Sequence, residues 1–146
     1  MEQGRENNPR PDVPRSIVEK ALPNDHGGVL AWKPADFPAA VEAATRCGYC
    51  CVGGVFQFRF PGATYEPYWL TTDFLSRDTG ESWSAYVGRC NEYTLSTFDT
   101  LLKATNWDAE VARYGDAVRE RVPAGADPLE YLVFEALFEN EAGHTL

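Results

Sequence analysis

The sequence predicts an α+β fold in which helices pack on a small antiparallel sheet, with extra helices on the C-terminal side. Within residues 49–60, phenylalanine occupies every second position from Phe56 to Phe60. This period of two is typical of a strand with one buried face. A Pro-Gly turn and a second strand at residues 64–72 follow. Residues 83–103 repeat apolar side chains at steps of three and four, which predicts a long helix.

The chain begins with a segment that differs in composition from the rest. Residues 1–12 are polar and rich in proline, so we expect a disordered N-terminal arm, with residues 13–146 forming a single domain. Asp12 can cap a short helix over residues 13–21. The Pro, Asn and Gly residues of segment 23–28 predict a turn.

Two further elements are expected between this turn and the long strand. Residues 29–32 form a short apolar segment that can add a third strand to the sheet. Pro34 suits the start of a helix that runs to Arg46, and Gly48 can stop that helix. Its buried stripe is expected to contain Phe37, Val41, Ala44 and Cys47.

The long strand contains an adjacent glycine pair, Gly53 and Gly54. Such a pair predicts a bulge, a bend, or the close approach of another backbone. Pro67 lies inside the second strand and has no N–H to donate, so we expect that strand at the edge of the sheet. The aromatic residues on one face of the long strand are Phe56, Phe58 and Phe60.

Three helices are expected in the C-terminal half. A polar loop at residues 73–80 leads to Ser82, which can cap the long helix that follows. A second helix is expected over residues 106–118, where apolar side chains recur on one side. Asp127 can cap a last helix that begins at Pro128 and runs to residue 140. Its residues make most of the helix surface apolar.

Charge is the clearest feature of the composition. The chain has 13 basic and 22 acidic residues and a net charge of -9, which disfavours nucleic-acid binding and favours a basic partner. No apolar run is long enough for a transmembrane helix, and the first residues lack the apolar core of a secretory signal. We therefore expect a cytoplasmic protein that binds neither nucleic acid nor membranes.

The cysteines do not form a metal-binding pattern. Cys47 and Cys50 make a C-x-x-C, but a zinc site needs a second pair or suitably spaced histidines, and the two histidines are isolated. A redox C-x-x-C opens a helix after a strand, which is the reverse of the expected order here. For these two and for Cys51 and Cys90 we expect free thiols, with no metal and no cofactor.

No catalytic motif is recognisable. The glycine pair lacks the spacing of a phosphate-binding loop, and no G-x-S-x-G is present. The cysteines have no histidine at a credible position to act as a base, and acidic residues in loops are usually just exposed. We therefore expect a protein that is not an enzyme.

An aromatic cluster is the strongest candidate for function. Tyr65 and Trp69 share one face of the second strand, and Tyr68 lies on the other. Tyr and Trp beside carboxylates such as Glu66 match the composition of an interface with a cationic partner. The alternative is that all of these aromatic residues are core, since aromatic side chains mostly bury.

Several short motifs occur in a characteristic order. They are Gly28-Val-Leu-Ala-Trp32, an Ala-rich helix, Gly53-Gly54, Tyr68-Trp69 and Glu81-Ser-Trp-Ser-Ala-Tyr-Val87. In this order, residues 23–103 resemble the Immunity protein 40 family of bacterial polymorphic-toxin systems. One departure is that the family places an acidic residue and then an aromatic residue after the glycine pair, where this chain has Val and Phe.

The resemblance implies a cytosolic, non-enzymatic protein that binds and blocks a cognate toxin. Because the chain is acidic, the basic nucleic-acid cleft of a nuclease toxin is one possible target. A monomer and a homodimer are both compatible with the sequence, and Trp69 and Trp83 are expected to be structural. The expected toxin-binding residues are Glu66, Tyr68, Asp73, Asp78 and Glu81.

Two other functions remain open from the sequence. One is a small-molecule-binding regulator or enzyme with a pocket between sheet and helices, lined by Phe58, Trp69, Tyr86 and Cys90. The other is a structural adaptor that dimerises through the aromatic C-terminal helix.

Overall fold

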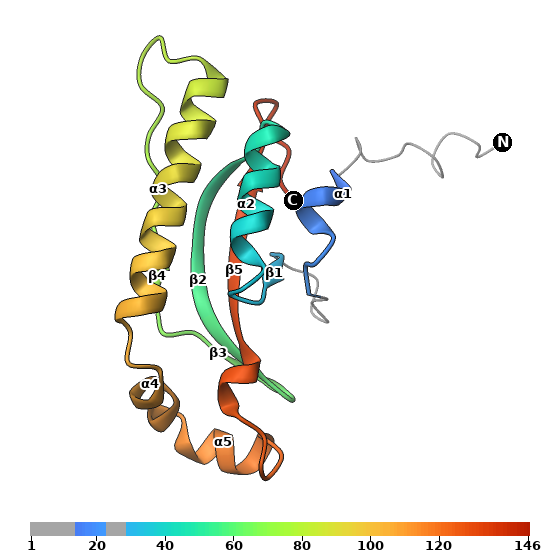
Figure 1. Cartoon of the computed structure of the whole chain (residues 1–146), viewed down its shortest axis with the longest axis vertical. Coiled ribbons are helices and arrows are strands. Elements are labelled where there is room, and N and C mark those ends of the chain that lie inside the picture. The colour runs from blue at the N-terminus through green and yellow to red at the C-terminus, as the bar shows by residue number, and fades with distance from the viewer. Residues whose placement is uncertain (1–13, 23–28) are drawn as a thin grey trace, which may run out of the picture.

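A computed structural model describes residues 14–22 and 29–146 of the chain. Helices cover one face of a five-stranded antiparallel sheet, so the predicted α+β class is confirmed (Figure 1). The arm predicted at residues 1–12 and the turn predicted at residues 23–28 lie outside the described residues. The elements are α1 (Arg15–Val18), β1 (Ala31–Trp32), α2 (Phe37–Arg46), β2 (Cys50–Phe60), β3 (Ala63–Tyr65), β4 (Thr71–Thr72), α3 (Trp83–Ala104), α4 (Trp107–Arg113), α5 (Gly115–Arg121), the 3-10 helix η1 (Pro128–Tyr131) and β5 (Leu132–Glu139).

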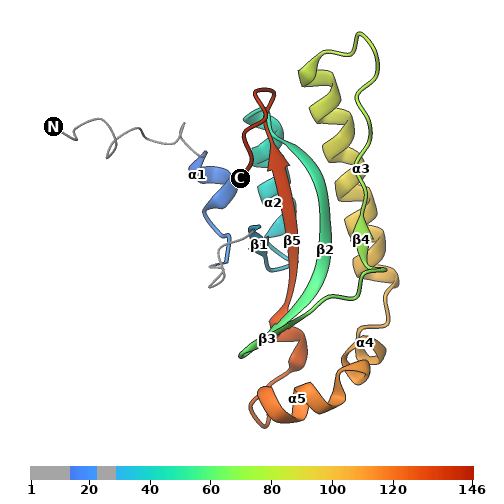
Figure 2. The ribbon, with the colours of Figure 1, turned by 180° about the vertical axis from the view of Figure 1, so that it is seen from behind.

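Strand β2 organises the sheet. It pairs with β5 along one edge and with β3 and β4 along the other, and β1 pairs with the far edge of β5. The short segment at residues 29–32 therefore does supply a further strand, as predicted. Figures 1 and 2 place α2 and α3 on the same face of β2 and β5, while no helix of the described residues covers the opposite face.

The glycine pair of β2 forms a bulge and permits close packing. The register between β2 and β5 shifts between Cys51 and Gly54, and Gly53 has a φ of 126°, which L side chains rarely adopt. A Cβ on Gly54 would lie 2.8 Å from the carbonyl oxygen of Glu135 and would overlap the ring of Phe134. Both the predicted bulge and the predicted close approach are confirmed, and the approaching strand is β5.

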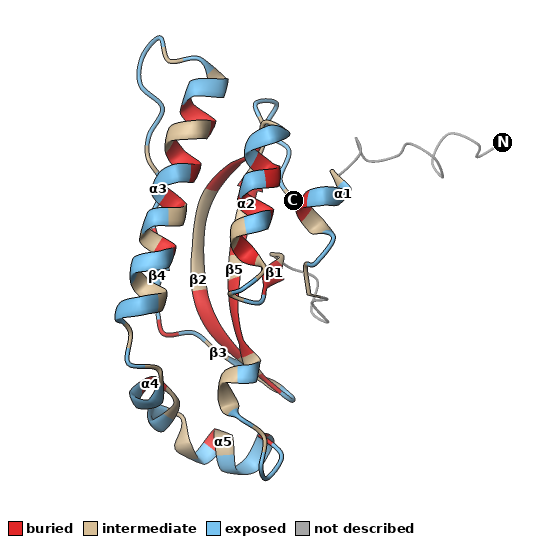
Figure 3. Cartoon of the chain, in the orientation of Figure 1, coloured by how far each residue is buried: buried red, intermediate tan, exposed pale blue. Residues whose placement is uncertain are grey.

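The core between the sheet and the helices is largely aromatic. The ring of Phe56 stacks on Phe98 of α3 with centroids 5.3 Å apart and meets Phe134 of β5 at 4.8 Å. Phe37 of α2 packs against Phe134 at 4.5 Å. All four side chains are buried, and burying each contributes about 1.5 to 3 kcal/mol. Figure 3 colours buried parts of α2, α3, β2 and β5 red.

Helices α2 and α3 begin and end close to the predicted positions. Pro38 lies in the first turn of α2, where a missing N–H breaks no helical hydrogen bond. The hydroxyl of Ser82 caps α3 as predicted, accepting a hydrogen bond from the N–H of Ala85 at 3.1 Å. Within residues 14–22 and 29–146, none of the helices combines the length and apolar character that a membrane crossing requires.

The single helix predicted over residues 106–118 is wrong, because the chain turns at Tyr114. This residue has φ -106° and ψ 27° and separates α4 from α5, whose first residue is Gly115, a poor residue for a helix interior. The turn brings the ring of Tyr114 to 5.0 Å from Tyr65 and 5.9 Å from Phe58. Packing on the sheet therefore replaces one long helix by two short ones.

The last helix predicted over residues 128–140 is also wrong. Asp127 does cap a helix, since its carboxylate accepts a hydrogen bond from the N–H of Leu129 at 3.0 Å, but η1 ends after one turn. The chain then continues as β5, so the apolar helix that the adaptor hypothesis required is absent. The segment has apolar residues at both helical and alternating spacing, and pairing with β2 selects the strand. The alternating set that enters the core is Leu132, Phe134, Ala136 and Phe138.

The second strand predicted over residues 64–72 consists of two short strands separated by a bend. The N–H of Leu70 donates to the carbonyl of Pro67 at 2.9 Å, and the carbonyl of Leu70 accepts from the N–H of Phe56 at 3.0 Å. Because Pro67 has no N–H, the ladder with β2 is interrupted here. β3 and β4 both lie on the edge of β2 away from β5, in agreement with the predicted edge position.

Candidate functional site

The five predicted binding residues do not form one cluster. Glu66 and Tyr68 lie in the bend between β3 and β4, which packs near α4. Asp78 and Glu81 lie beside the first turns of α3, and Asp73 directly follows β4. Helix α3 has 22 residues and is therefore about 33 Å long. The structure thus separates the predicted site into an aromatic part and an acidic part.

The aromatic part, residues 66–70, is here named the aromatic bend. Tyr68 is 79% exposed and Trp69 is 49% exposed, and their rings meet edge to face with centroids 5.8 Å apart. The guanidinium of Arg113 in α4 lies 5.1 Å from the centroid of the Trp69 ring. The hydrogen bond from the N–H of Leu70 to Pro67 closes the bend, and the one from the N–H of Phe56 to Leu70 fixes it to β2. Two large aromatic side chains are therefore held in defined positions at the surface.

Glu66 at the start of this bend belongs to a polar network on the helix-free face of the sheet. The Gln57 amide donates to Glu66 at 2.6 Å and to Glu135 at 3.1 Å. The Arg59 guanidinium donates to Gln57 at 2.5 Å and to Glu135 at 3.3 Å. Gln57 is only 1% exposed, so these partners satisfy a buried amide. Glu66 therefore has a structural contact in addition to its exposed position.

The acidic part contains an internal clamp. The Arg89 guanidinium donates to the two oxygens of Glu81 at 2.9 and 2.8 Å, a bidentate arrangement. The backbone N–H of Asp78 donates to the same carboxylate at 3.0 Å. The hydrogen bonds from Arg89, and then that from Asp78, lower the pKa of Glu81 to about 2. Glu81 thus holds the loop of residues 73–82 against α3.

The other two carboxylates of this loop are more available to a partner. Asp73 is exposed and makes no ion pair with any residue in the described ranges. Asp78 is also exposed, and its carboxylate lies 3.7 Å from the Arg89 guanidinium, a long contact in solvent. The loop therefore presents two acidic side chains on a backbone that Glu81 fixes.

The buried cysteines make contacts with one another and with the backbone. The thiols of Cys50 and Cys90 both donate to the carbonyl of Cys51, at 3.6 and 3.4 Å. Contact with the Cys90 thiol and burial together raise the pKa of Cys50. Burial raises the pKa of Cys51 to about 11. None of the three is accessible to solvent, so they act as small packing residues.

The C-x-x-C motif does not bring its two thiols to one site. Cys47 is exposed at the end of α2, whereas Cys50 is buried at the start of β2. Among the residues that the structure describes, no three His, Cys, Asp or Glu side chains are grouped closely enough to hold a metal ion.

The pocket predicted from Phe58, Trp69, Tyr86 and Cys90 is not formed by these residues. Phe58 is buried in the main core, where it packs on Tyr114. Tyr86 and Cys90 belong to a second, smaller cluster against the start of β2, and Trp69 is at the surface. The four residues therefore lie in separate places and do not face one pocket.

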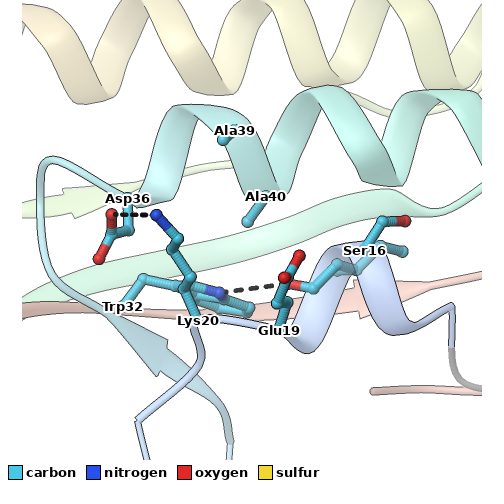
Figure 4. Close-up of a pocket in the computed structure, with 8 residues that line it drawn as sticks. Ser16, Glu19, Lys20, Trp32, Asp36, Ala39 and Ala40 are labelled. Carbon is cyan, nitrogen blue, oxygen red and sulfur yellow. Dashed lines mark hydrogen bonds and ion pairs between the residues drawn. The ribbon is translucent and has the colours of Figure 1, made fainter.

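Other hollows occur among the residues that the structure describes. A depression of about 390 Å³ lies between the end of β3 and the α4–α5 junction, lined in part by Tyr65, Arg113 and Tyr114. A groove of about 310 Å³ lies between α2 and α3. A cavity of about 80 Å³ lies between α1 and α2, beside the ion pair of Lys20 and Asp36 (Figure 4). The last has room for a few water molecules.

Comparison of the chain with models of protein families, with curated proteins and with solved structures found no match.

Sequence reasoning missed several residues that contact the aromatic bend. Arg113 and the depression beside it depend on the break between α4 and α5, which the helical periodicity conceals. Glu135 was assigned to a helix and joins the network of Glu66 only because the segment is a strand. The available signal was Gly115, which stands directly after an aromatic residue in the middle of the predicted helix.

Proposed function

We propose that this protein is a non-enzymatic immunity protein that binds a cognate toxin domain in the cytoplasm and blocks its activity. The observation that carries the proposal is the exposure of Tyr68 and Trp69 on the aromatic bend. The order of sequence motifs over residues 23–103, which resembles the Immunity protein 40 family, supports the same function.

The aromatic bend has the properties of an energetic centre in a protein interface. Tyr, Trp and Arg are the residues that contribute most to such centres. Here the ring of Trp69 contacts Tyr68 on one side and the guanidinium of Arg113 on another. Their mutual contacts restrict the rings before binding, which reduces the entropy that association costs. The depression beside Arg113 can receive a side chain from the partner.

The charge of the chain supports a basic partner. The net charge is -9, and Asp73 and Asp78 are exposed on a loop fixed by Glu81. A nuclease domain has a basic cleft for its substrate, and an acidic protein is attracted to such a cleft. We therefore propose that the acidic loop steers association and that the aromatic bend provides most of the affinity.

The test is co-expression with the toxin domain encoded by the adjacent gene, followed by purification and measurement of the dissociation constant. We expect a stable complex and restored growth of the host cells. Tyr68→Ala and Trp69→Ala should each weaken the complex by at least about 30-fold, which corresponds to loss of an interface centre.

The matched control is Tyr93→Ala, which removes another exposed tyrosine from the outer side of α3. It should leave the affinity unchanged. Equal losses for Tyr68→Ala and Tyr93→Ala would contradict the assignment of the aromatic bend. Absence of both toxicity and a complex would contradict the function itself, and native mass spectrometry for a bound small molecule would then address the ligand-binding alternative.

A further inference from the structure

We propose that the groove between α2 and α3 docks a lysine or arginine side chain of a basic partner protein. The inference rests on the proposed function in taking the partner to be a basic protein. It concerns a surface separate from the aromatic bend, on the helical side of the molecule, and it can be tested independently.

The walls of the groove come from two helices. Glu42 and Thr45 of α2 line one side. The side formed by α3 has residues at positions i, i+3, i+4 and i+7, which is one face of a helix. These residues are Gly88, Asn91, Glu92 and Leu95.

The polar groups at the floor are already satisfied within the fold. The Asn91 amide donates to the hydroxyl of Thr45 and to the carbonyl of Tyr49, both at 2.9 Å. Its oxygen accepts from the N–H of Cys51 at 2.8 Å. The Thr45 hydroxyl in turn donates to a carbonyl of α2 at 3.0 Å. The floor therefore offers a ligand apolar contact and no free hydrogen-bonding side chain.

The floor also contains Gly88, and the packing of the fold does not require a glycine at this position. Glycine weakens a helix interior, and Gly88 lies well inside α3. A Cβ at this position would meet nothing within 4 Å, so packing does not require glycine there. The missing side chain leaves the helix backbone open to the groove, on the same face of α3 as Leu95 and about two turns before it. A docked group can therefore approach the backbone closely.

The rim of the groove carries negative charge from both walls. Glu42 and Glu92 are exposed, and neither forms an ion pair with another residue in the described part of the chain. Lysine and arginine combine a long apolar stem with a cationic head. The stem fits the apolar floor at Gly88 and Leu95, and the head fits between the two carboxylates. An anionic ligand would be repelled at this rim.

The open form of the groove suits a side chain that a macromolecule presents. Its volume of about 310 Å³ is at the lower end for small-molecule sites, which are also more enclosed. The chain has a net charge of -9, so a basic protein is attracted over a longer range before it contacts the groove. These observations favour a protein side chain over a free metabolite.

The first test uses short peptides and needs no toxin. The amide resonances of the 15N-labelled full chain are followed during titration with acetyl-Gly-Arg-Gly-amide and acetyl-Gly-Lys-Gly-amide. We expect saturable shifts at Gly88, Glu92 and Leu95. The control peptide contains citrulline, which keeps the shape of arginine without its charge, and it should cause no saturable shift. Glu42→Gln combined with Glu92→Gln should abolish the response to both cationic peptides.

Equal shifts with the citrulline peptide would overturn the proposal, as would shifts that persist in the double variant. A response to the arginine peptide alone would retain the proposal and assign the guanidinium as the docked group. A response to the lysine peptide alone would assign the ammonium.

The second test measures the complex with the toxin domain. Glu42→Gln with Glu92→Gln should weaken it by about tenfold. Gly88→Leu should weaken it as well by filling the floor, whereas Thr100→Leu on the exposed side of α3 should not. In case Gly88→Leu disturbs the helix, Gly88→Ala provides a milder variant that should raise the Tm and still lower the affinity.

If the groove variants keep their affinity for the toxin domain while Tyr68→Ala and Trp69→Ala lose it, the docking proposal for the groove is wrong and the immunity function is retained. If the toxin domain does not bind the unaltered chain, the function is wrong, and the peptide titration still decides whether the groove takes a cationic side chain.

Discussion

At the scale of single residues, the junction of β2 and β5 depends on the absence of a side chain at Gly54. A Cβ there would overlap Phe134 and would lie 2.8 Å from the Glu135 carbonyl oxygen, so the two central strands would have to separate. We predict that Gly54→Ala lowers the free energy of unfolding by about 3 kcal/mol, as expected for overpacking of a buried strand pair. Urea unfolding followed by circular dichroism measures this change.

The control for this prediction is Gly88→Ala. Gly88 has a helical environment with open space at its Cβ position, so alanine should stabilise the protein by about 0.5 to 1 kcal/mol. The two substitutions are chemically identical and should have opposite signs. If Gly54→Ala leaves the free energy of unfolding unchanged or raises it, as Gly88→Ala should, then β2 and β5 can separate without loss of stability.

Glu81 gives a pH-dependent prediction at the same scale. Its hydrogen bonds with Arg89 lower its pKa from 4.5 to about 2 in the folded protein. The folded state therefore binds the proton less readily than the unfolded state, and the stabilisation is present above pH 4.5 and is lost as the pH falls toward 2. Glu81→Gln should lower the urea midpoint at pH 7, and the difference from the unaltered protein should shrink between pH 4.5 and pH 2.

The control is Asp73→Asn in the same loop, where the removed carboxylate makes no ion pair with any residue that the structure describes. It should leave the urea midpoint at pH 7 nearly unchanged. A constant difference between Glu81→Gln and the unaltered protein down to pH 2 would mean that the clamp does not depend on the charge of Glu81.

At the scale of helices and strands, the sequence predicted those elements whose structure depends on nearby residues alone. Helix α3 follows from its apolar spacing and the Ser82 cap, and β2 follows from its alternation and glycine pair. β5 could not be assigned in this way, because Leu132–Glu139 satisfies both helical and alternating patterns. The choice depends on pairing with β2, which lies far away in the sequence.

The same limit applies to the candidate site. Alternation near Pro67 placed Tyr68 on the face opposite to Tyr65 and Trp69, but it could not decide which face is exposed. That exposure depends on the bend that Leu70 closes. The engagement of Glu81 with Arg89 is also hidden, because the two are eight residues apart across the start of a helix. Contacts between elements therefore decide which acidic residues are available to a partner.

At the scale of the whole molecule, charge and exposed aromatic residues are expected to act at different steps of binding. Exposed charges mainly change the association rate, whereas a rigid aromatic centre mainly changes dissociation. We predict that Asp73→Lys combined with Asp78→Lys lowers the association rate constant for the toxin domain by about three- to tenfold at low salt. Stopped-flow measurements over a range of salt concentrations test this, and the difference should shrink as salt screens the charges. Glu81 is left unchanged so that the loop keeps its clamp.

The matched control is Glu130→Lys combined with Glu141→Lys, which makes the same change in net charge at two exposed positions outside the loop. If the loop steers association, this control should reduce the rate constant less than the loop variant does. Equal reductions would show that net charge alone attracts the partner and that the loop has no special position in the interface. Unchanged dissociation rate constants in both charge variants, together with faster dissociation in Trp69→Ala, would separate steering by the loop from affinity at the aromatic bend. Long-range attraction acts mainly on association, whereas short-range contacts act mainly on dissociation.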